Sequence, residues 1–262
     1  MKKTVKILSL VLALVMALAL CACGTQPADD PEKPADTDAK VLTMGTNASF
    51  PPYEYYDGDQ IVGIDAEIAA AIAEKLGMQL SIEDMDFNAI IPSVVSGKVD
   101  MGMAGMTVTE ERQQSVAFSI SYATGVQSII VKEGSPITSY DDLAAEGATY
   151  KVGVQMATTG HIYAEDEFGV DRVVLFDNGN DATMALKNGK VDCVIIDNEP
   201  AKAYVAANEG LVILDSAYAV EDYAACFAKD NTELVEKFNA ALQTLIDNGT
   251  VAEIVGKYIK AE

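Results

Sequence analysis

The tetrapeptide Gly-Lys-Val-Asp occurs twice in the chain, at 97–100 and at 189–192, and this repeat constrains the fold more than any other feature. Each copy follows a short helical pattern and leads into an apolar run typical of a strand, at 99–106 in the first case and at 193–196 in the second. The repeat therefore predicts two similar α/β units that follow one another along the chain.

Short apolar strands alternate with helical patterns through both units, and this alternation predicts parallel sheets with crossover helices. One such helix is expected to be capped by Asp65 and ended by Gly77. A helical tail at 232–260 is expected to pack on the first unit. We expect a first lobe at 41–131 plus 223–262 and a second lobe at 132–222.

The first 22 residues have the pattern of a signal peptide. Lysines at the start precede an uncharged apolar run at 7–20, which is short for a membrane span. Cys23 follows a small residue, as in a bacterial lipobox, so cleavage before Cys23 and lipid on its sulfur are expected. An uncleaved anchor is the alternative. Residues 23–40, rich in Pro, Asp and Ala, are expected to form a disordered tether.

The composition excludes some partners. Acidic residues outnumber basic ones by 40 to 18, which gives a net charge of -22, so nucleic acid is not expected as a partner. Cys193 and Cys226 lie in apolar segments and are expected to be buried thiols. A disulfide between these two cysteines remains open.

Polar side chains follow the predicted strands, where open parallel sheets bind their ligands. They include one arginine, one carboxylate, several hydroxyls and an aromatic ring, a set that complements a zwitterion. These residues are Asn47, Ser49, Phe50, Thr107, Thr109, Arg112, Gln155, Thr158, Thr159 and Asp197.

Arg112 supplies the planar, two-pronged donor that an α-carboxylate requires. Thr109 and Thr158 each begin a predicted helix, where free N–H groups also favour anions. Asp197 is the candidate partner for an α-ammonium group. The alternatives are a surface ion pair for Arg112 and a helix cap for Asp197.

Seven segments together resemble one family, the family-3 extracellular solute-binding proteins that bind polar amino acids for ABC importers. The resemblance covers nearly all of 41–262 in the family's order. The segments lie at 45–54, 62–67, 85–92, 104–112, 118–122, 152–160 and 195–200.

The resemblance implies a periplasmic-binding-protein-like fold of type II, with two doubly wound α/β lobes joined by a two-segment hinge. The crossings are expected near Ile129–Glu133 and Asp222–Ala228. By motif, Arg112 resembles the family's carboxylate clamp and Asp197 its ammonium-binding acid. The other matching residues are Thr107 and the Gly105 backbone, as ammonium and carboxylate partners, Thr158 and Thr159 at the second-lobe carboxylate site, and the stacking rings of Phe50 and Phe87.

Several positions depart from the family pattern. Asn47 stands where many members have an Asp that binds a cationic or amide side chain, and Ala157 stands where Gly is usual. Gln155 lies at a position that varies with the ligand, while Glu54 and Glu199 can attract a cation. The side chain of the ligand is therefore expected to be polar, with its charge left open.

The family implies a monomeric, extracytoplasmic protein that carries a small amino acid to ABC permease subunits in the membrane. No cofactor, metal or catalytic role is expected. Two alternatives remain: an enzyme of the same fold, such as a dehydratase, and a sensor lipoprotein. His161 is the only histidine, and no nucleophile–base pair stands out in the sequence.

Overall fold

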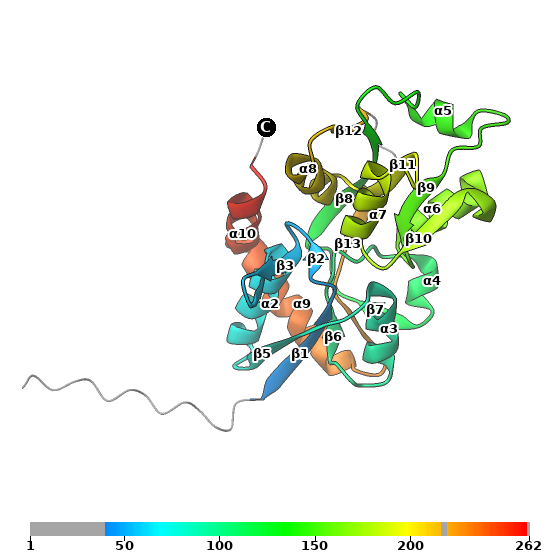
Figure 1. Ribbon diagram of the computed structural model, residues 1–262. Coiled ribbons are helices and arrows are strands. Elements are labelled where there is room, and N and C mark those ends of the chain that lie inside the picture. Colours follow the sequence, from blue (N-terminus) through cyan, green and yellow to red (C-terminus); the bar gives the residue numbers. More distant parts are fainter. Residues whose placement is uncertain (1–39, 216–218, 261–262) are drawn as a thin grey trace, which may run out of the picture. The chain divides into compact units, whose positions relative to one another are not determined.

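The computed structural model describes residues 40–215 and 219–260. Residues Ala39–Glu262 form one compact unit that contains two large β-sheets flanked by helices (Figure 1). The predicted signal peptide, the tether up to residue 39 and Cys23 lie outside the described residues.

The first sheet has the strand order β5-β1-β6-β14-β7. Strands β5, β1 and β6 are parallel to one another, as predicted, whereas β14 runs antiparallel to both of its neighbours. The strands are β1 (Val41–Thr46), β5 (Gln79–Asp84), β6 (Met101–Gly102), β7 (Val116–Phe118) and β14 (Cys226–Ala228), with helices α2 (Ile64–Lys75), α3 (Phe87–Val95), α4 (Glu110–Gln113), α9 (Thr232–Asp247) and α10 (Thr250–Tyr258). A small antiparallel sheet adds β2 (Ser49–Phe50), β3 (Glu54–Asp57) and β4 (Gln60–Val62).

The second sheet has the order β10-β9-β11-β8-β12, with β13 also paired to β8. Its strands β10, β9 and β11 are parallel, while β8 is antiparallel to β11, β12 and β13. The elements are β8 (Ala123–Lys132), α5 (Tyr140–Ala144), β9 (Val152–Gln155), α6 (Thr159–Phe168), a 3₁₀ turn (Val170–Arg172), β10 (Val173–Phe176), α7 (Gly179–Lys187), β11 (Cys193–Asp197), α8 (Asn198–Ala207), β12 (Leu211–Ile213) and β13 (Ala219–Tyr223).

Strand β8 corrects one predicted boundary. The expected crossing near Ile129–Glu133 is wrong, because all of β8 pairs within the second sheet and the chain has already left the first sheet before Ala123. The return to the first sheet lies between Tyr223 at the end of β13 and Cys226 at the start of β14. From the sequence, the long apolar run of β8 is expected to belong to the first lobe and to lead into the hinge, whereas the structure places it in the second sheet.

The sequence repeat has a structural counterpart in both sheets. Asp100 accepts a hydrogen bond from the Thr43 backbone N–H at 2.7 Å, and Asp192 accepts one from the Lys151 N–H, also at 2.7 Å. In each sheet this aspartate ties the segment after a helix to the start of an earlier, parallel strand. The two copies therefore close equivalent corners of the two sheets.

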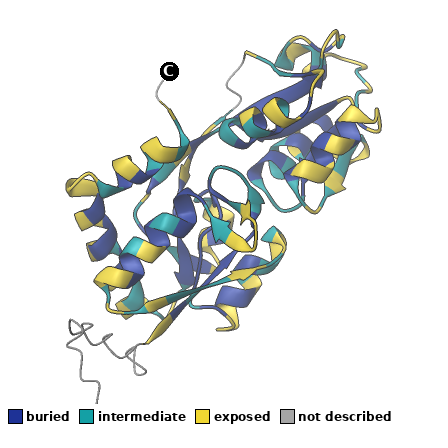
Figure 2. Cartoon of the chain, turned by 60° about the vertical axis from the view of Figure 1, so that its left-hand side comes forward, coloured by how far each residue is buried: buried dark blue, intermediate teal, exposed yellow. Residues whose placement is uncertain are grey.

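Buried residues gather on the strands and on the helix faces that cover them (Figure 2). The tail packs on the first sheet, as expected, with Phe238 and Leu242 of α9 in one cluster with Leu42 and Met44 of β1. The predicted single helix is interrupted at Gly249, whose φ is 83°. Both described cysteines are buried free thiols in different clusters.

Two local predictions fail. The expected strand at 99–106 shrinks to β6, because the chain leaves the sheet and turns at Gly105 with a φ of 52°. Asp65 does not cap α2, since the N-cap is Gly63 and the Asp65 side chain is buried in the first turn. Both differences shape the pocket described next.

Candidate functional site

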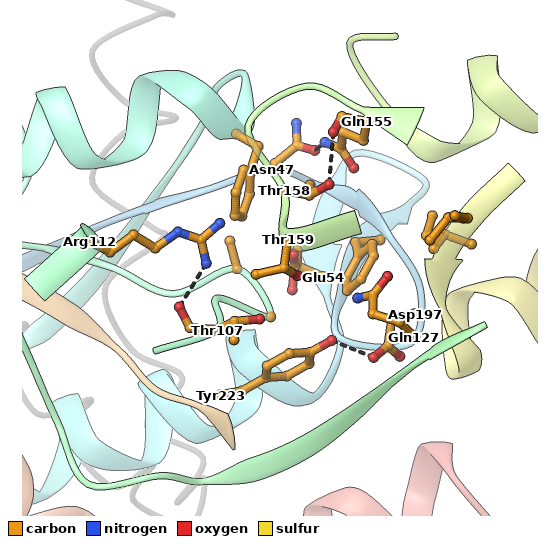
Figure 3. Close-up of a pocket in the computed structure, with 16 residues that line it drawn as sticks. Asn47, Glu54, Thr107, Arg112, Gln127, Gln155, Thr158, Thr159, Asp197 and Tyr223 are labelled. Carbon is orange, nitrogen blue, oxygen red and sulfur yellow. Dashed lines mark hydrogen bonds between the residues drawn. The ribbon is translucent and has the colours of Figure 1, made fainter. Parts of the chain in front are cut away.

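One pocket brings together eight of the ten polar and aromatic residues that follow the predicted strands, together with Phe87 and Gly105, which the family resemblance adds. Ser49 and Thr109 do not line it. It encloses about 450 Å³ of space free of protein atoms, open solvent at its mouth included. Figure 3 shows Arg112 reaching in on one side, with Asp197 and Gln127 on the opposite side. The lining residues are Asn47, Phe50, Glu54, Phe87, Ala104, Gly105, Thr107, Arg112, Gln127, Gln155, Thr158, Thr159, Ile195, Ile196, Asp197 and Tyr223.

Arg112 is the cationic end of the pocket. The residue is only 8% exposed. Its guanidinium donates to the Thr107 carbonyl at 2.7 Å and to the Ala157 carbonyl at 3.0 Å, and lies 5.3 Å from the centre of the Phe87 ring. It forms no ion pair with any carboxylate in the part of the chain that the structure describes. Burial lowers the pKa of this guanidinium, while the nearby carboxylate of Glu221 acts in the opposite direction. The alternative of a surface ion pair for Arg112 is therefore not found among the described residues, and the pocket favours an anion beside Arg112.

The N-terminus of α6 lies at the same end. Thr158 caps the helix by accepting from the His161 N–H at 3.3 Å, and its own hydroxyl donates to the Gln155 carbonyl. Thr159 and Gly160 begin the helix, so their N–H groups have no acceptor within it. An anion near Arg112 is therefore expected to bind these backbone groups rather than the Thr158 hydroxyl. Ala157, with a φ of 64°, adopts the left-handed conformation that explains the usual glycine at this position.

Asp197 is the anionic end of the pocket. Its carboxylate accepts from the Tyr223 hydroxyl at 2.5 Å, from the Val126 N–H at 2.9 Å and from the Glu199 N–H at 3.2 Å. The last bond makes Asp197 the N-cap of α8, so the alternative structural role exists alongside its place in the pocket. Burial raises the pKa of Asp197 to about 6.

Gly125 makes this arrangement possible. A Cβ atom at this position would lie 2.3 Å from the Tyr223 hydroxyl and 2.4 Å from an Asp197 oxygen. Any residue larger than glycine at position 125 would therefore push Tyr223 and Asp197 apart and break the hydrogen bond between them.

A pair of buried acids lies at another wall of the pocket, where Glu54 belongs to the lining and Asp65 does not. Glu54 is 1% exposed and its Oε2 has no hydrogen-bond partner among the described residues, while Asp65 accepts from the Gly105 N–H and the Tyr122 hydroxyl, both at 2.8 Å. Burial raises the pKa of Asp65 to about 6, and burial together with Asp65 raises the pKa of Glu54 well above its usual range.

The amide side chains of Asn47 and Gln155 also line the pocket. Gln155 donates to the Asn47 side-chain oxygen at 2.9 Å and to the Asp177 carbonyl at 3.1 Å. Asn47 in turn donates to the Met85 carbonyl at 2.9 Å. Since these bonds use the Gln155 amide hydrogens, its carbonyl oxygen remains an acceptor for a ligand. Phe50 and Phe87 add apolar rings to the lining.

Several lining residues were not predicted from the sequence. Gln127 and Tyr223 escaped notice because they lie on strands β8 and β13, near predicted crossings rather than after parallel strands. The register that pairs Asp197 with Gln127 could have revealed Gln127, had β8 been assigned to the second sheet. Glu54 was expected only to attract a cation. Glu199, its predicted companion, instead pairs with Lys202 at 3.0 Å and does not line the pocket.

The described residues contain no cluster of three or more His, Cys, Asp or Glu side chains that could hold a metal ion. Within 40–215 and 219–260, every helix is too short or too polar to span a bilayer.

The two sheets and the pocket define an α/β binding protein with a type II periplasmic-binding-protein fold. Residues 42–261 match the bacterial extracellular solute-binding proteins, family 3. The arginine-binding extracellular protein ArtP of Bacillus subtilis (strain 168) is 36% identical over 266 residues, which cover 98% of this chain and 99% of ArtP. This chain therefore belongs to family 3 of the extracellular solute-binding proteins.

Solved structures agree with this assignment. An ancestral arginine-binding protein bound to glutamine has a TM-score of 0.79 at 40% identity, covering 84% of this chain and 98% of its own. The arginine-, lysine-, histidine-binding protein ArtJ from Geobacillus stearothermophilus has a TM-score of 0.79 at 37% identity, covering 85% of this chain and 96% of its own. The family and these relatives are binding proteins.

Proposed function

We propose that this chain is the extracytoplasmic substrate-binding component of an ABC importer, which captures a polar L-amino acid in the pocket and delivers it to the permease. Its relatives are named for binding arginine, histidine or glutamine. The observation that carries the proposal is a buried Arg112, which forms no ion pair within 40–215 and 219–260 and faces Asp197 across one pocket. A zwitterion supplies the missing counter-charge at both ends.

Each end of the amino acid has an assigned partner. The α-carboxylate binds the Arg112 guanidinium and the first N–H groups of α6. The α-ammonium binds Asp197 and the Gly105 carbonyl, since the Gly105 N–H already donates to Asp65. The ligand side chain extends toward Glu54 and the ring of Phe50, both of which line the pocket.

A cationic side chain fits this pocket best. Beyond Arg112 and the helix N–H groups, the polar lining near the expected side chain offers acceptors, namely the Glu54 carboxyl and the Gln155 oxygen. No cation contributes to the pKa of Glu54 or Asp65, so the acid pair has no internal counter-charge. A guanidinium offers five N–H donors and a positive charge to this wall.

The remaining assignments rest on the sequence. Residues 1–22 form a cleaved signal peptide, Cys23 carries a lipid that anchors the mature protein to the cell membrane, and the protein acts as a monomer without catalysis. Mass spectrometry of the membrane fraction tests the lipid on Cys23. Recovery of unchanged ligand after incubation separates binding from a dehydratase activity.

The function is tested by isothermal titration calorimetry with L-arginine, L-histidine and L-glutamine. We expect arginine to bind most tightly. Glu54→Gln is expected to weaken arginine binding by about 10-fold to 100-fold, the effect of losing a hydrogen bond to a charged group, and to change glutamine binding by less than about threefold. Glu199→Gln is the matched control and should change neither. Tight glutamine binding with no response to Glu54→Gln would contradict the cationic assignment.

Affinity is expected to fall in acid. The pKa of Asp197 lies at about 6, above its ordinary value of 3.8, and only the ionised form attracts an ammonium group. Protons therefore compete with the ligand once the pH drops below about 6, and the affinity at pH 5 should be about tenfold lower than at pH 7.5. The same profile measured for Asp197→Asn, which keeps Asp65 but has no ionisable group at position 197, isolates the Asp197 contribution. A flat profile for the wild type would contradict it.

A further inference from the structure

Glu221 lies behind the pocket wall and collects hydrogen bonds from three lining residues. Its Oε2 accepts from the Thr159 hydroxyl at 2.9 Å, the Thr107 hydroxyl at 3.0 Å and the Gln127 amide at 3.1 Å. Its Oε1 accepts from the Tyr163 hydroxyl at 2.9 Å. Glu221 is 5% exposed and does not itself line the pocket.

These bonds decide which way the hydroxyl protons point. The oxygen Oε2 is shared by three groups that donate to it, so Thr107 and Thr159 each direct their single hydroxyl hydrogen to Glu221. Each hydroxyl then offers only lone pairs to the pocket. In the same way, Gln127 uses its amide nitrogen toward Glu221 and is left with a buried, unpartnered Oε1.

We propose that Glu221 is a positioning residue that selects for the α-amino group of the ligand by turning Thr107, Gln127 and Thr159 into acceptors. These three oxygens, like Asp197 and the Gly105 carbonyl, can only accept hydrogen bonds, and an ammonium group can only donate them. They cannot donate to a carboxylate, so the two ends of the ligand are distinguished by more than charge. The inference rests on the proposed function and deepens it.

The test compares L-arginine with 5-guanidinopentanoate, which lacks only the α-amino group. Glu221→Met removes the shared acceptor and frees the hydroxyls to turn toward the pocket. Arginine binding should weaken by about 10-fold to 100-fold, the cost of mispaired buried polar groups, while binding of the analogue changes by less than about threefold. A purely structural role would weaken both ligands alike, and that result would overturn the proposal.

Glu221→Gln is the conservative variant. Its amide oxygen can replace Oε2 as the shared acceptor, and the Tyr163 hydroxyl can turn to accept from the new NH₂ group. We expect this variant to restore most of the preference for arginine over the analogue. If it loses the preference as fully as Glu221→Met does, negative charge rather than proton placement is responsible and the proposal is wrong.

Two further variants complete the design. Glu67→Met places the same substitution on α2, outside the pocket lining, and should leave both affinities unchanged. Thr107→Val removes one acceptor while keeping the side-chain shape, so it tests the proposal even if Glu221→Met fails to fold; an unchanged preference would overturn it. Wild-type protein that binds neither arginine nor glutamine would instead overturn the proposed function and this inference together. If only glutamine binds, L-glutamine and 4-carbamoylbutanoate form the test pair.

Discussion

Arg112→Ala is expected to weaken binding of L-arginine by about 2–5 kcal/mol, the range for truncating one partner of a buried charge pair. The ligand carboxylate would be removed from water and would meet only the N–H groups of α6. The bond from the guanidinium to the Ala157 carbonyl would also disappear, so the segment before α6 would lose a contact that helps to hold it against the first sheet. Isothermal titration calorimetry gives the loss directly.

Arg112→Lys separates charge from geometry. A lysine keeps the positive charge but cannot donate two parallel bonds, so an intermediate loss is expected. The control is Arg172→Ala. Arg172 is the other arginine of the chain, and its guanidinium carbon lies 5.1 Å from the centre of the Phe168 ring, outside the pocket lining. The affinity of the Arg172→Ala variant for L-arginine should equal that of the wild type. Near-normal binding by Arg112→Ala would refute the placement of the carboxylate.

Asp197→Asn is expected to have the second large effect, again about 2–5 kcal/mol, because the ammonium group would lose its only fully charged partner. The asparagine oxygen can still accept from Tyr223 and Val126, so the sheet around β11 should keep its structure. Binding of 5-guanidinopentanoate, which has no ammonium group, should change little. Equal losses for both ligands would contradict the assignment.

Asp192→Asn is the matched control, since Asp192 directly precedes β11 and Asp197 ends it. Asp192 accepts from the Lys151 N–H and lies outside the pocket lining, and an asparagine oxygen can still accept that bond, so the dissociation constant should stay unchanged. A comparison of the two variants separates damage to the fold from damage to the site.

Much of the site could be predicted because its residues follow parallel strands. The rule that ligands bind at the carboxyl ends of such strands led to Asn47, Arg112, Gln155 and Asp197, all of which line the pocket. The Gly-Lys-Val-Asp repeat was equally informative about the fold, since its two aspartates make equivalent bonds in the two sheets.

The rest depends on antiparallel pairing and buried charge, which leave weak signals in a sequence. Strand β8 is a long apolar run with no turn signal to show which sheet it joins, so Gln127 was missed. Glu221 lies on β13 opposite Gly125, a register that only the folded sheet defines. Asp65 precedes a helical pattern as a capping residue would, and only its burial beside Glu54 distinguishes it from one.

The position of β14 has a consequence for how the chain matures. This strand lies between β6 and β7, yet it follows them by more than a hundred residues, after the whole second sheet. A chain that emerges from its N-terminus can therefore complete the second sheet from one contiguous stretch while β6 and β7 still lack their shared neighbour. The half of the molecule that begins first is the half that is finished last, and its two unpaired strands remain open to wrong partners until residue 228 has appeared.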